Sequence, residues 1–366
     1  MPHSQKPPKP NKCYVCKQPL LEKHAHYPLL CLECGDFNEK KRLARHDLHG
    51  YTALVTGGRT KIGYYTALRL LRDGAQVIIT SRFPYTALHH YLQEADCCDW
   101  QDRIHIYGLD FRRIERVEAF ARFLDKQFPS IDIIINNAAQ TVRMREEEYV
   151  ALAQNEQSLQ NRLGRNHSPQ LSSREIAVTS FEQTDSPPLQ LQPLQPVQGE
   201  GDAITTTSRE YHSWTAQADQ IPLVEMLEVQ LINVTAPFLL NTQLKPAMVR
   251  SPRRNRFIIN VSSIEGKFSM KRKNPYHVHT NMAKASLNMM TLTMAKEYKK
   301  DRIYITSVDP GWVSDQIPQK ANKAAIQLPL DFHDAAARIC DPIYMSKEAD
   351  KPPTGLFFKD YQPIDW

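Results

Sequence analysis

Short apolar runs alternate with helix-length segments along most of the chain. The runs cover residues 51–56, 77–80, 104–108, 131–135, 257–261 and 303–307. Each run has the length and the Val/Ile content of a strand that is buried on both faces, and the segments between them are long enough for helices. This alternation predicts an α/β fold in which a parallel sheet is doubly wound with helices.

The alternation is interrupted between residues 141 and 220, where Gln, Ser, Pro and Glu dominate and residues 189–198 are of low complexity. Such a segment buries too little apolar surface to offset the entropy lost on ordering. We therefore predict a largely disordered insertion with a short helix at 146–163. The α/β domain then consists of two parts, 46–140 and 221–366, and its second part opens with a long helix that includes 224–240.

Residues 1–45 form a separate segment with two Cys-x-x-Cys pairs, separated by fourteen residues. The four cysteines are Cys13, Cys16, Cys31 and Cys34. Two such pairs supply four thiolates for a tetrahedral Zn²⁺, which can fold a segment too small for its own core. His24 and His26 lie between the pairs and are alternative ligands. Four protein ligands leave no open coordination position, so we expect a structural zinc site or a docking surface for another protein.

The sequence carries 46 Lys and Arg against 40 Asp and Glu, a formal charge of +6 that is mild for 366 residues. This argues against a dedicated nucleic-acid-binding protein. The start lacks the apolar core of a secretory signal, and no apolar run approaches the roughly 18 residues of a membrane span. The remaining cysteines, Cys97, Cys98 and Cys340, do not suggest a secreted disulfide framework. We expect an intracellular protein, cytoplasmic or nuclear, with no membrane partner.

A glycine-containing turn follows the first strand and precedes an apolar-striped helix. Its residues include Thr56, Gly57, Arg59, Lys61, Ile62 and Gly63. Glycines at such a turn let backbone N–H groups approach a pyrophosphate at the start of the helix. The turn therefore predicts a dinucleotide-binding site.

Further polar residues follow the later strands in a fixed order. They are Asp110, Asn136 to Ala139, Asn233, Ser262 and Ser263, Lys284, and Pro310 with Gly311. Together with the turn, this set resembles the short-chain dehydrogenase/reductases, which are Rossmann-fold oxidoreductases, over residues 51–140 and 221–315, with a continuation to the end of the chain. The resemblance implies that Asp110 faces the adenine, that Asn136 and Ala138 line the cofactor, and that Pro310 and Gly311 form the turn over the nicotinamide.

Two positions depart from the family pattern at the cofactor turns. Lys61 stands where the family has the middle glycine, and Ala139 replaces another glycine. Lys61 either reshapes the turn or replaces a close backbone approach with a charge contact to phosphate. A third interpretation is that Lys61 abolishes the cofactor site.

The end of the second strand indicates which dinucleotide is bound. Ser81 is neutral and Arg82 is cationic, whereas an acidic residue there would bond the ribose hydroxyls and exclude a 2′-phosphate. A guanidinium binds that phosphate with paired hydrogen bonds. We therefore expect NADP(H) rather than NAD(H), with Arg59 assisting. Since the strands begin only at Tyr51, cofactor binding is expected to survive removal of residues 1–45.

The resemblance also implies catalytic roles. Ser263 matches the serine that polarises the substrate carbonyl, Lys284 the lysine that binds the nicotinamide ribose, and Asn233 the asparagine of the proton relay. The family tyrosine, four residues before the lysine, is replaced by Thr280. An aliphatic hydroxyl is a poor substitute because its pKa cannot be brought near neutrality as that of a phenol can.

Two hypotheses remain open. In the first, the chain is an oxidoreductase acting on a small carbonyl or alcohol, and the acid/base role has moved to Tyr276, four residues before Thr280, or to His277 or His279. In the second, the chain is a catalytically inactive NADP(H)-binding protein whose zinc module or insertion binds other proteins. The resemblance implies a homo-oligomer in either case.

Overall fold

The computed structural model describes residues 12–163, 177–180, 211–270, 273–314 and 327–366. Within these ranges the chain forms one nine-stranded sheet in the order β5-β3-β2-β1-β4-β6-β7-β8-β9. The strands are β1 (Thr52–Val55), β2 (Gln76–Ser81), β3 (Ile104–Gly108), β4 (Ile133–Asn136), β5 (Ala177–Ser180), β6 (Arg256–Val261), β7 (Ile303–Asp309), β8 (Leu356–Lys359) and β9 (Gln362–Ile364). All neighbouring strands are parallel except β8 and β9. The doubly wound fold predicted from the apolar runs is confirmed.

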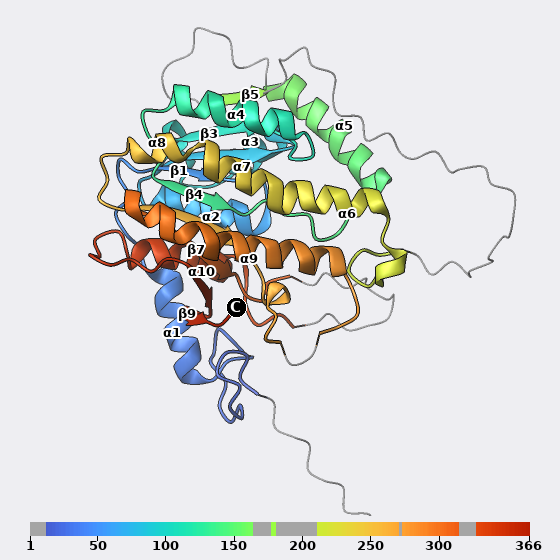
Figure 1. The fold of residues 1–366 in the computed structure, drawn as a ribbon, viewed down its shortest axis with the longest axis vertical. Coiled ribbons are helices and arrows are strands. Elements are labelled where there is room, and N and C mark those ends of the chain that lie inside the picture. Colours follow the sequence, from blue (N-terminus) through green and yellow to red (C-terminus); the bar gives the residue numbers. More distant parts are fainter. Residues whose placement is uncertain (1–11, 164–176, 181–210, 271–272, 315–326) are drawn as a thin grey trace, which may run out of the picture.

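Helices cover both faces of the sheet (Figure 1). They are α1 (Leu32–Leu43), α2 (Lys61–Arg72), α3 (Pro84–Leu92), α4 (Ile114–Gln127), α5 (Glu146–Leu163), α6 (Leu223–Gln230), α7 (Ala236–Gln243), α8 (Lys245–Val249), α9 (Val278–Tyr298) and α10 (Phe332–Tyr344). One core holds side chains of α2, α3 and α10, and the other holds side chains of α4, α7 and α9. Along β1, Ala53 and Val55 enter the first core and Leu54 the second. This alternation explains the uninterrupted apolar runs, because both faces of each central strand are buried.

The strand order reverses between β1 and β4, because the chain builds outward from β1 through β2 and β3 and then continues on the other side with β4 and β6. In open α/β sheets, ligands bind outside the carboxyl ends of the strands at such a point. The glycine turn after β1 and the segment after β4 meet there. The fold therefore places the predicted cofactor residues together at the carboxyl ends of the central strands.

The stretch Leu223–Gln243 joins α6, a π-helical turn at Leu231–Thr235 and α7. Contrary to our expectation from the sequence, it is long and apolar enough to cross a membrane by length and composition, with a mean hydropathy of 1.5. Its inward side chains, among them Ile232, Ala236 and Leu240, are buried against the sheet in the core that contains α4. One side of this stretch therefore packs in the core of the domain, and 44% of its apolar window is buried.

Parts of the predicted insertion take part in the fold. The helix expected at 146–163 is present as α5 and contacts α3, and β5 pairs with β3 at the edge of the sheet. Residues 211–220 return beside the start of α9, where the ring of Trp214 stacks on that of His277 at 4.0 Å. The low-complexity residues 189–198 lie outside the described residues.

Candidate active site

The turn after β1 has the tight geometry expected of a phosphate-binding turn. Gly57 has a φ of 70°, and a Cβ on Gly63 would lie 2.2 Å from the carbonyl oxygen of Gly57. Thr56 is buried, and its hydroxyl oxygen accepts hydrogen bonds from the backbone N–H groups of Asn137 (3.0 Å) and Ala138 (2.9 Å). Thr56 therefore ties the turn to the segment that follows β4.

Lys61 adopts the backbone conformation that a glycine would have supplied. Its φ is 54°, in the left-handed region, at the first residue of α2. A non-glycine residue there costs roughly 1–3 kcal/mol and is typical of functional sites. Since Lys61 is exposed and lines the cavity described next, the turn accommodates the lysine and presents its ammonium to the cavity.

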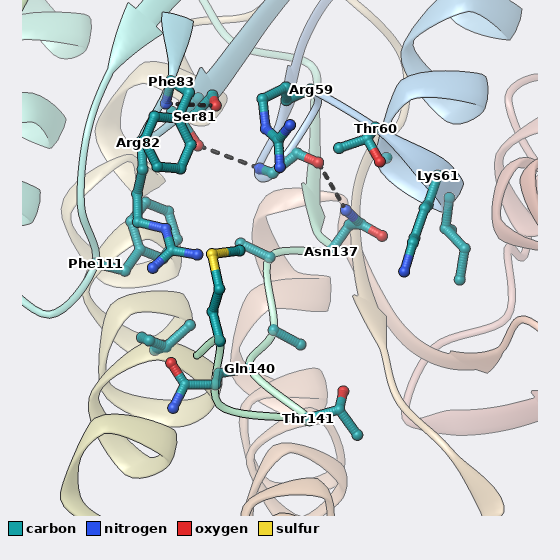
Figure 2. A pocket seen from close by; sticks show the side chains of 18 of the residues that line it. Arg59, Thr60, Lys61, Ser81, Arg82, Phe83, Phe111, Asn137, Gln140 and Thr141 are labelled. Carbon is teal, nitrogen blue, oxygen red and sulfur yellow. Dashed lines mark hydrogen bonds between the residues drawn. The ribbon is translucent and has the colours of Figure 1, made fainter. Parts of the chain in front are cut away.

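A cavity of about 620 Å³ opens over the carboxyl ends of β1, β2 and β4. Figure 2 shows side chains of its wall. Of the predicted cofactor residues, those that line it are Gly57, Arg59, Lys61, Ile62, Gly63, Ser81, Arg82, Asp110 and Ala138. Its volume lies within the range of known ligand sites, roughly 300–1,000 Å³. Lys284, Pro310 and Gly311 are not among its lining residues.

The end of this cavity beside β2 is positively charged. The guanidinium carbons of Arg59 and Arg82 lie 5.4 and 5.9 Å from the ring centre of the buried Phe83 (Figure 2). Burial and the like charge of Arg82 lower the pKa of Arg59. Two cations that disfavour each other make a site where a bound anion would relieve the repulsion.

Glu156 of α5 is a site residue that sequence reasoning missed. Its carboxylate accepts hydrogen bonds from the backbone N–H groups of Tyr85 (2.6 Å) and Thr86 (2.8 Å) and from the hydroxyl of Thr86 (2.6 Å), at the first turn of α3. An anion at a helix N-terminus is stabilised by the unpaired N–H groups. Glu156 also acts electrostatically on Arg59, so the insertion contributes to the charge balance of the cavity.

Asn136 does not line the cavity, contrary to the expectation from the family pattern. It is the last residue of β4, it is buried, and its side-chain N–H₂ donates to the side-chain oxygens of Asn241 and Asn260, both at 2.8 Å. Successive side chains of a strand point to opposite faces, so the neighbouring Asn137 faces the cavity instead. Asn137 donates to the carbonyl oxygen of Thr56 at 2.9 Å.

Asp110 lines the cavity as expected, but its carboxylate is paired with Arg112 of the same loop. Although burial raises the pKa of Asp110, the hydrogen bonds and charge of Arg112 lower it overall. Asp110 therefore faces the cavity as a neutralised pair with Arg112.

Lys284 lies buried on α9 at the end of β6. Its ammonium donates to the carbonyl oxygen of Val261 at 2.9 Å. Burial lowers its pKa to about 8, opposed by the charge of Asp309. The Ser263 turn packs directly on this helix, because a Cβ on Gly266 would lie 2.6 Å from the backbone carbon of Lys284.

Asp309, the last residue of β7, joins the turns around Lys284. Its carboxylate accepts from the backbone N–H groups of Ile264 and Gly311, both at 2.7 Å. It thereby links the Ser263 turn to the Pro310–Gly311 turn, where Gly311 has a φ of 88°. Sequence reasoning missed Asp309, although an acidic residue directly before Pro310 was the available signal.

Asn233 lies in the π-helical turn between α6 and α7. Its side-chain oxygen accepts from the backbone N–H of Gln140 at 2.7 Å, and its N–H₂ donates to the carbonyl oxygen of the same residue at 3.0 Å. The amide thus holds Gln140, which lines the cavity, in place. Single π-turns of this kind are frequent at functional sites.

Thr280 occupies the position of the family tyrosine on α9 and is buried. Its hydroxyl has no hydrogen-bond partner among the described residues. The helix begins at Val278, after His277 in a left-handed conformation with a φ of 42°, and therefore does not extend to Tyr276.

The helix therefore does not place Tyr276 one turn before Thr280, which the hypothesis of a moved acid/base required. Tyr276 is 37% exposed and lines a second cavity of about 340 Å³ with Val278, Met282 and Ala285 of α9. That cavity follows a different face of the helix from Thr280 and Lys284, which lie one turn apart.

The two histidines considered as alternatives have structural partners. The ring of His277 stacks on Trp214, and its Nδ1 lies 2.8 Å from the carbonyl oxygen of that residue. His279 is fully buried, with its Nε2 3.3 Å from a carboxylate oxygen of Glu225. His279 thereby ties α9 to α6, and His277 ties it to the returning end of the insertion.

The four cysteines of the N-terminal segment form one cluster. Their sulfur atoms all lie within 4.8 Å of one another, and those of Cys16 and Cys31 are 3.9 Å apart. A tetrahedron with Zn–S distances of roughly 2.3 Å has edges of about 3.8 Å. His24 is instead paired with Asp36, at 3.2 Å, and Glu39, at 3.6 Å, so it stands outside the cluster.

The family model described as short chain dehydrogenase matches residues 51–164 and 212–325. The chain belongs to the short-chain dehydrogenase family. Its relatives include the uncharacterised protein R665 of Acanthamoeba polyphaga mimivirus, 31% identical over 355 residues that cover 92% of this chain and 72% of that protein. Human retinol dehydrogenase 14 is 33% identical over 103 residues, which cover 25% of this chain and 31% of that protein. The chain thus aligns with less than a third of that enzyme.

Solved structures with the same fold include two proteins with bound cofactor. The NADPH-bound carbonyl reductase from chicken fatty liver is 16% identical with a TM-score of 0.55, covering 87% of this chain and all of that one. A short chain dehydrogenase from Burkholderia cenocepacia in complex with NADP is 18% identical with a TM-score of 0.55, covering 86% and 97%. At this identity the likeness concerns the fold.

Proposed function

We propose that this short-chain dehydrogenase is an NADP(H)-dependent oxidoreductase that acts on a small carbonyl or alcohol. The observation that carries the proposal is the pair of guanidinium groups, Arg59 and Arg82, beside Phe83 at the end of β2. A 2′-phosphate placed there would receive charge-assisted hydrogen bonds that NAD(H) cannot accept. The NADP(H) held by the chicken and Burkholderia proteins supports this choice.

The residues around the cavity fit the rest of a dinucleotide. Gly57 and Gly63 permit the tight turn at the start of α2, where backbone N–H groups would bind a pyrophosphate, and the ammonium of Lys61 would pair with it. Ala138 would line the cofactor as expected, together with Asn137 in place of the expected Asn136. Pro310 and Gly311, fixed by Asp309, would form the turn over the nicotinamide. Bound NADPH would supply the hydride for carbonyl reduction.

The proton requires a different source from the family tyrosine, and we assign it to Lys284. The backbone of Lys284 packs against the Ser263 turn, and its buried ammonium bonds the carbonyl oxygen of Val261, two residues before Ser263. A pKa of about 8 suits proton transfer near neutral pH. Ser263 would orient the carbonyl, and the ammonium would give a proton to the carbonyl oxygen as its carbon takes up the hydride. Reduction needs the protonated form, so its rate should fall as the pH rises through about 8.

Titration of the purified chain with NADPH and NADH tests the cofactor choice. We expect NADPH to bind more tightly, and Arg82→Ala to weaken NADPH at least tenfold while NADH changes little. Equal affinity for the two cofactors would refute the proposal. A panel of aldehydes and ketones then tests turnover: Tyr276→Phe should retain it, and Lys284→Met should lose it.

One observation favours a second candidate function, a catalytically inactive NADP(H)-binding protein. The hydroxyl of Thr280 has no partner in the described part of the chain, and the nearest phenol in sequence, Tyr276, lines a different cavity. If the chain is catalytically inactive, the wild-type protein binds NADPH but reduces no carbonyl in the panel, and Thr280→Tyr creates activity. Activity in wild type excludes this candidate.

We propose that Cys13, Cys16, Cys31 and Cys34 bind one structural Zn²⁺. The mutual distances of their sulfur atoms support it, and four thiolates leave no position open for catalysis. Elemental analysis should give one zinc per chain, and the Cys13→Ser, Cys31→Ser double variant should lose it. Unchanged zinc in that variant would contradict the assignment.

We also propose that the chain acts in the cytoplasm or nucleus and pairs with a second copy. All seven cysteines are free, as in reducing compartments. The apolar side chains of Val278, Met282, Met289 and Leu292 are exposed and form a stripe along α9. We infer that a second copy covers this stripe. Imaging of a tagged chain and light scattering test the two statements.

A further inference from the structure

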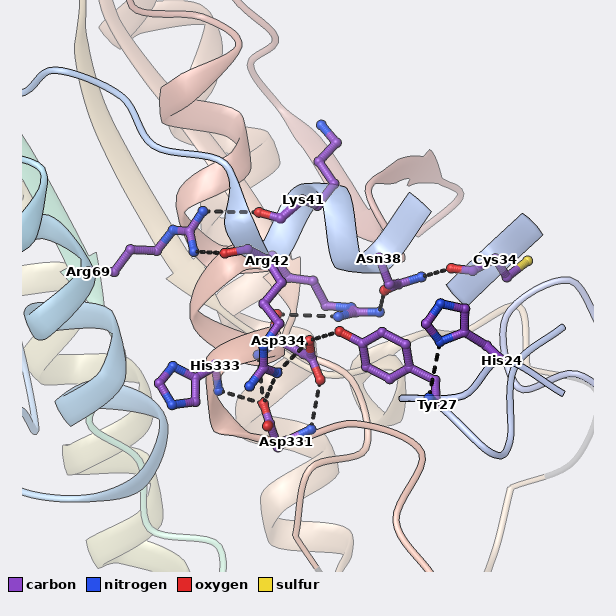
Figure 3. Close-up of polar contacts among 11 residues, drawn as sticks. His24, Tyr27, Cys34, Asn38, Lys41, Arg42, Arg69, Asp331, His333 and Asp334 are labelled. Atoms are coloured by element: carbon purple, nitrogen blue, oxygen red, sulfur yellow. Dashed lines mark hydrogen bonds and ion pairs between the residues drawn. The ribbon is translucent and has the colours of Figure 1, made fainter. Parts of the chain in front are cut away.

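The four-cysteine segment packs tightly against the oxidoreductase domain (Figure 3). Cys13, Leu20, Tyr27 and Leu30 share one buried cluster with Val313, Leu330 and Ala335 from the segments that follow β7. Ile62 and Phe332 pack against the same cluster. Both of these residues also line the 620 Å³ cavity, so a single packed layer separates the cysteines from the cofactor site.

Buried polar contacts fix the segment to the start of α10. The hydroxyl of Tyr27 donates to the buried Asp334 at 2.7 Å, and Arg42 pairs with Asp331 at 2.7 Å and with Asp334 at 3.1 Å (Figure 3). Asp331 and Asp334 are the two residues whose side chains cap the N-terminus of α10. The segment therefore holds the helix cap directly beside Phe332 of the cavity wall.

The helix that carries Cys34 is held from both neighbouring helices. The guanidinium of Arg69 on α2 donates to the carbonyl oxygens of Lys41 and Arg42 at the end of α1, at 3.0 and 2.7 Å. Asn38 of α1 donates to the carbonyl oxygen of Cys34 at 2.6 Å and accepts from Arg338 of α10. α2 is the helix that begins at the phosphate-binding turn, so α1 contacts both walls of the site.

A third contact reaches the turn proposed to cover the nicotinamide. The backbone N–H of Trp312 donates to the hydroxyl oxygen of Tyr14 at 3.0 Å, and Tyr14 lies between Cys13 and Cys16. Trp312 directly follows Gly311. The loop between the first two cysteines thus holds the residue after the Pro310–Gly311 turn.

From these contacts we propose that metal occupancy of the four-cysteine site controls the affinity of the cofactor cavity. Residues 12–31 contain no helix or strand longer than an isolated bridge, so the metal would fix the positions of Tyr14, Tyr27 and Leu30. Loss of the metal would release the packing behind Ile62, Phe332 and Trp312. The expectation that residues 1–45 are dispensable for cofactor binding is not supported by these contacts.

The inference rests on the proposed cofactor site, and it predicts a reciprocal coupling. Whatever factor zinc adds to NADPH affinity, NADPH must add to zinc affinity. Couplings between distinct sites commonly correspond to factors of roughly 5 to 150. A detached docking module would give a factor of one in both directions.

The test compares NADPH binding to the full chain with zinc, after removal of zinc by a chelator, and after zinc is restored. We expect NADPH affinity to fall at least fivefold without zinc and to recover with it, and we expect NADPH to slow transfer of zinc to a chromogenic chelator. Equal NADPH affinity in all three samples would overturn the inference while leaving the proposed function intact. Absence of NADPH binding to the zinc-loaded chain would instead overturn the proposed function, and this coupling with it.

Variants that keep all four cysteines decide the question if the zinc-free chain unfolds. Tyr27→Phe removes the hydroxyl bonded to Asp334, and Tyr14→Phe removes the one bonded to Trp312. Each should weaken NADPH several-fold at one zinc per chain. Leu21→Ala, at an 87% exposed position of the same segment, and Cys98→Ser, an exposed cysteine elsewhere, should change nothing. Wild-type affinity in both tyrosine variants would refute the coupling.

Discussion

Replacing Lys284 with methionine should stabilise the fold while removing turnover. The ordinary pKa of a lysine is 10.5, and burial holds that of Lys284 at about 8. Each tenfold change in a protonation equilibrium is worth about 1.4 kcal/mol, so keeping this ammonium charged in the folded state costs about 3 kcal/mol near pH 7. Methionine has a similar length and no charge. Losing the charged hydrogen bond to Val261 offsets about 2 kcal/mol, which leaves a net gain of about 1 kcal/mol.

The pH dependence of this gain identifies its cause. A lysine with a lowered folded-state pKa binds fewer protons in the folded than in the unfolded state between pH 8 and 10.5, so wild-type stability from this group rises over that interval. The advantage of Lys284→Met should therefore be full at pH 7 and shrink as the pH rises from 8 towards 10.5.

Urea unfolding of both proteins at several pH values measures the difference. Lys296→Met, at an exposed position of the same helix, is the matched control and should show almost no effect at any pH. A Lys284→Met protein that is less stable than wild type, or a gain that does not depend on pH, would refute the reasoning.

Three further substitutions test the cavity. Lys61→Gly should raise the free energy of unfolding by about 1 kcal/mol, because φ is 54° there, and should weaken NADPH; a less stable variant would contradict the strain argument. Glu156→Gln should lower the melting temperature, since α3 loses its anionic cap, and tighten NADPH several-fold more than NADH; the same change for both cofactors would count against the assigned phosphate position. Gly266→Ala should destabilise the fold by at least 1–3 kcal/mol in denaturant titrations, as its Cβ would meet the backbone of Lys284 at 2.6 Å, and a neutral effect would show that the turn can move.

The strands could be predicted because burial on both faces leaves a direct record in the sequence. Residues 133–135 form an apolar run in the sequence because Ile133 and Ile135 enter one core and Ile134 enters the other. The glycine turn could be predicted for a similar reason, because its backbone conformation restricts which residues fit. Lys61 shows the limit of that argument: a lysine took the conformation at an energetic cost.

Contacts between segments that are distant in the sequence could not be predicted, because no local pattern of residues indicates them. Glu156 lies in the helix predicted at 146–163, but its role depends on α5 lying beside the first turn of α3, which the helix pattern does not indicate. Tyr14 matters through the backbone of Trp312, which no local pattern indicates. Tyr276 was proposed as the acid/base because it lies four residues before Thr280, but the helix begins only at Val278, after the left-handed His277, so helical spacing does not apply to it. The strand β5 and the pair β8–β9 were not predicted either.

The docking of the cysteine segment also has a consequence for biosynthesis. The bond between Tyr27 and Asp334 joins residues 307 positions apart, and that between Lys41 and Asp341 joins residues 300 apart. At roughly 5–20 residues per second, a ribosome needs on the order of 15–60 seconds to make the second partner after the first. Throughout that interval Leu20 and Leu30 of the nascent segment lack the later part of their cluster, which includes Val313, Leu330 and Ala335. If the four thiolates bind zinc as proposed, early metal capture would protect the segment, and cells short of zinc during translation should accumulate chains that fail at the last step of folding.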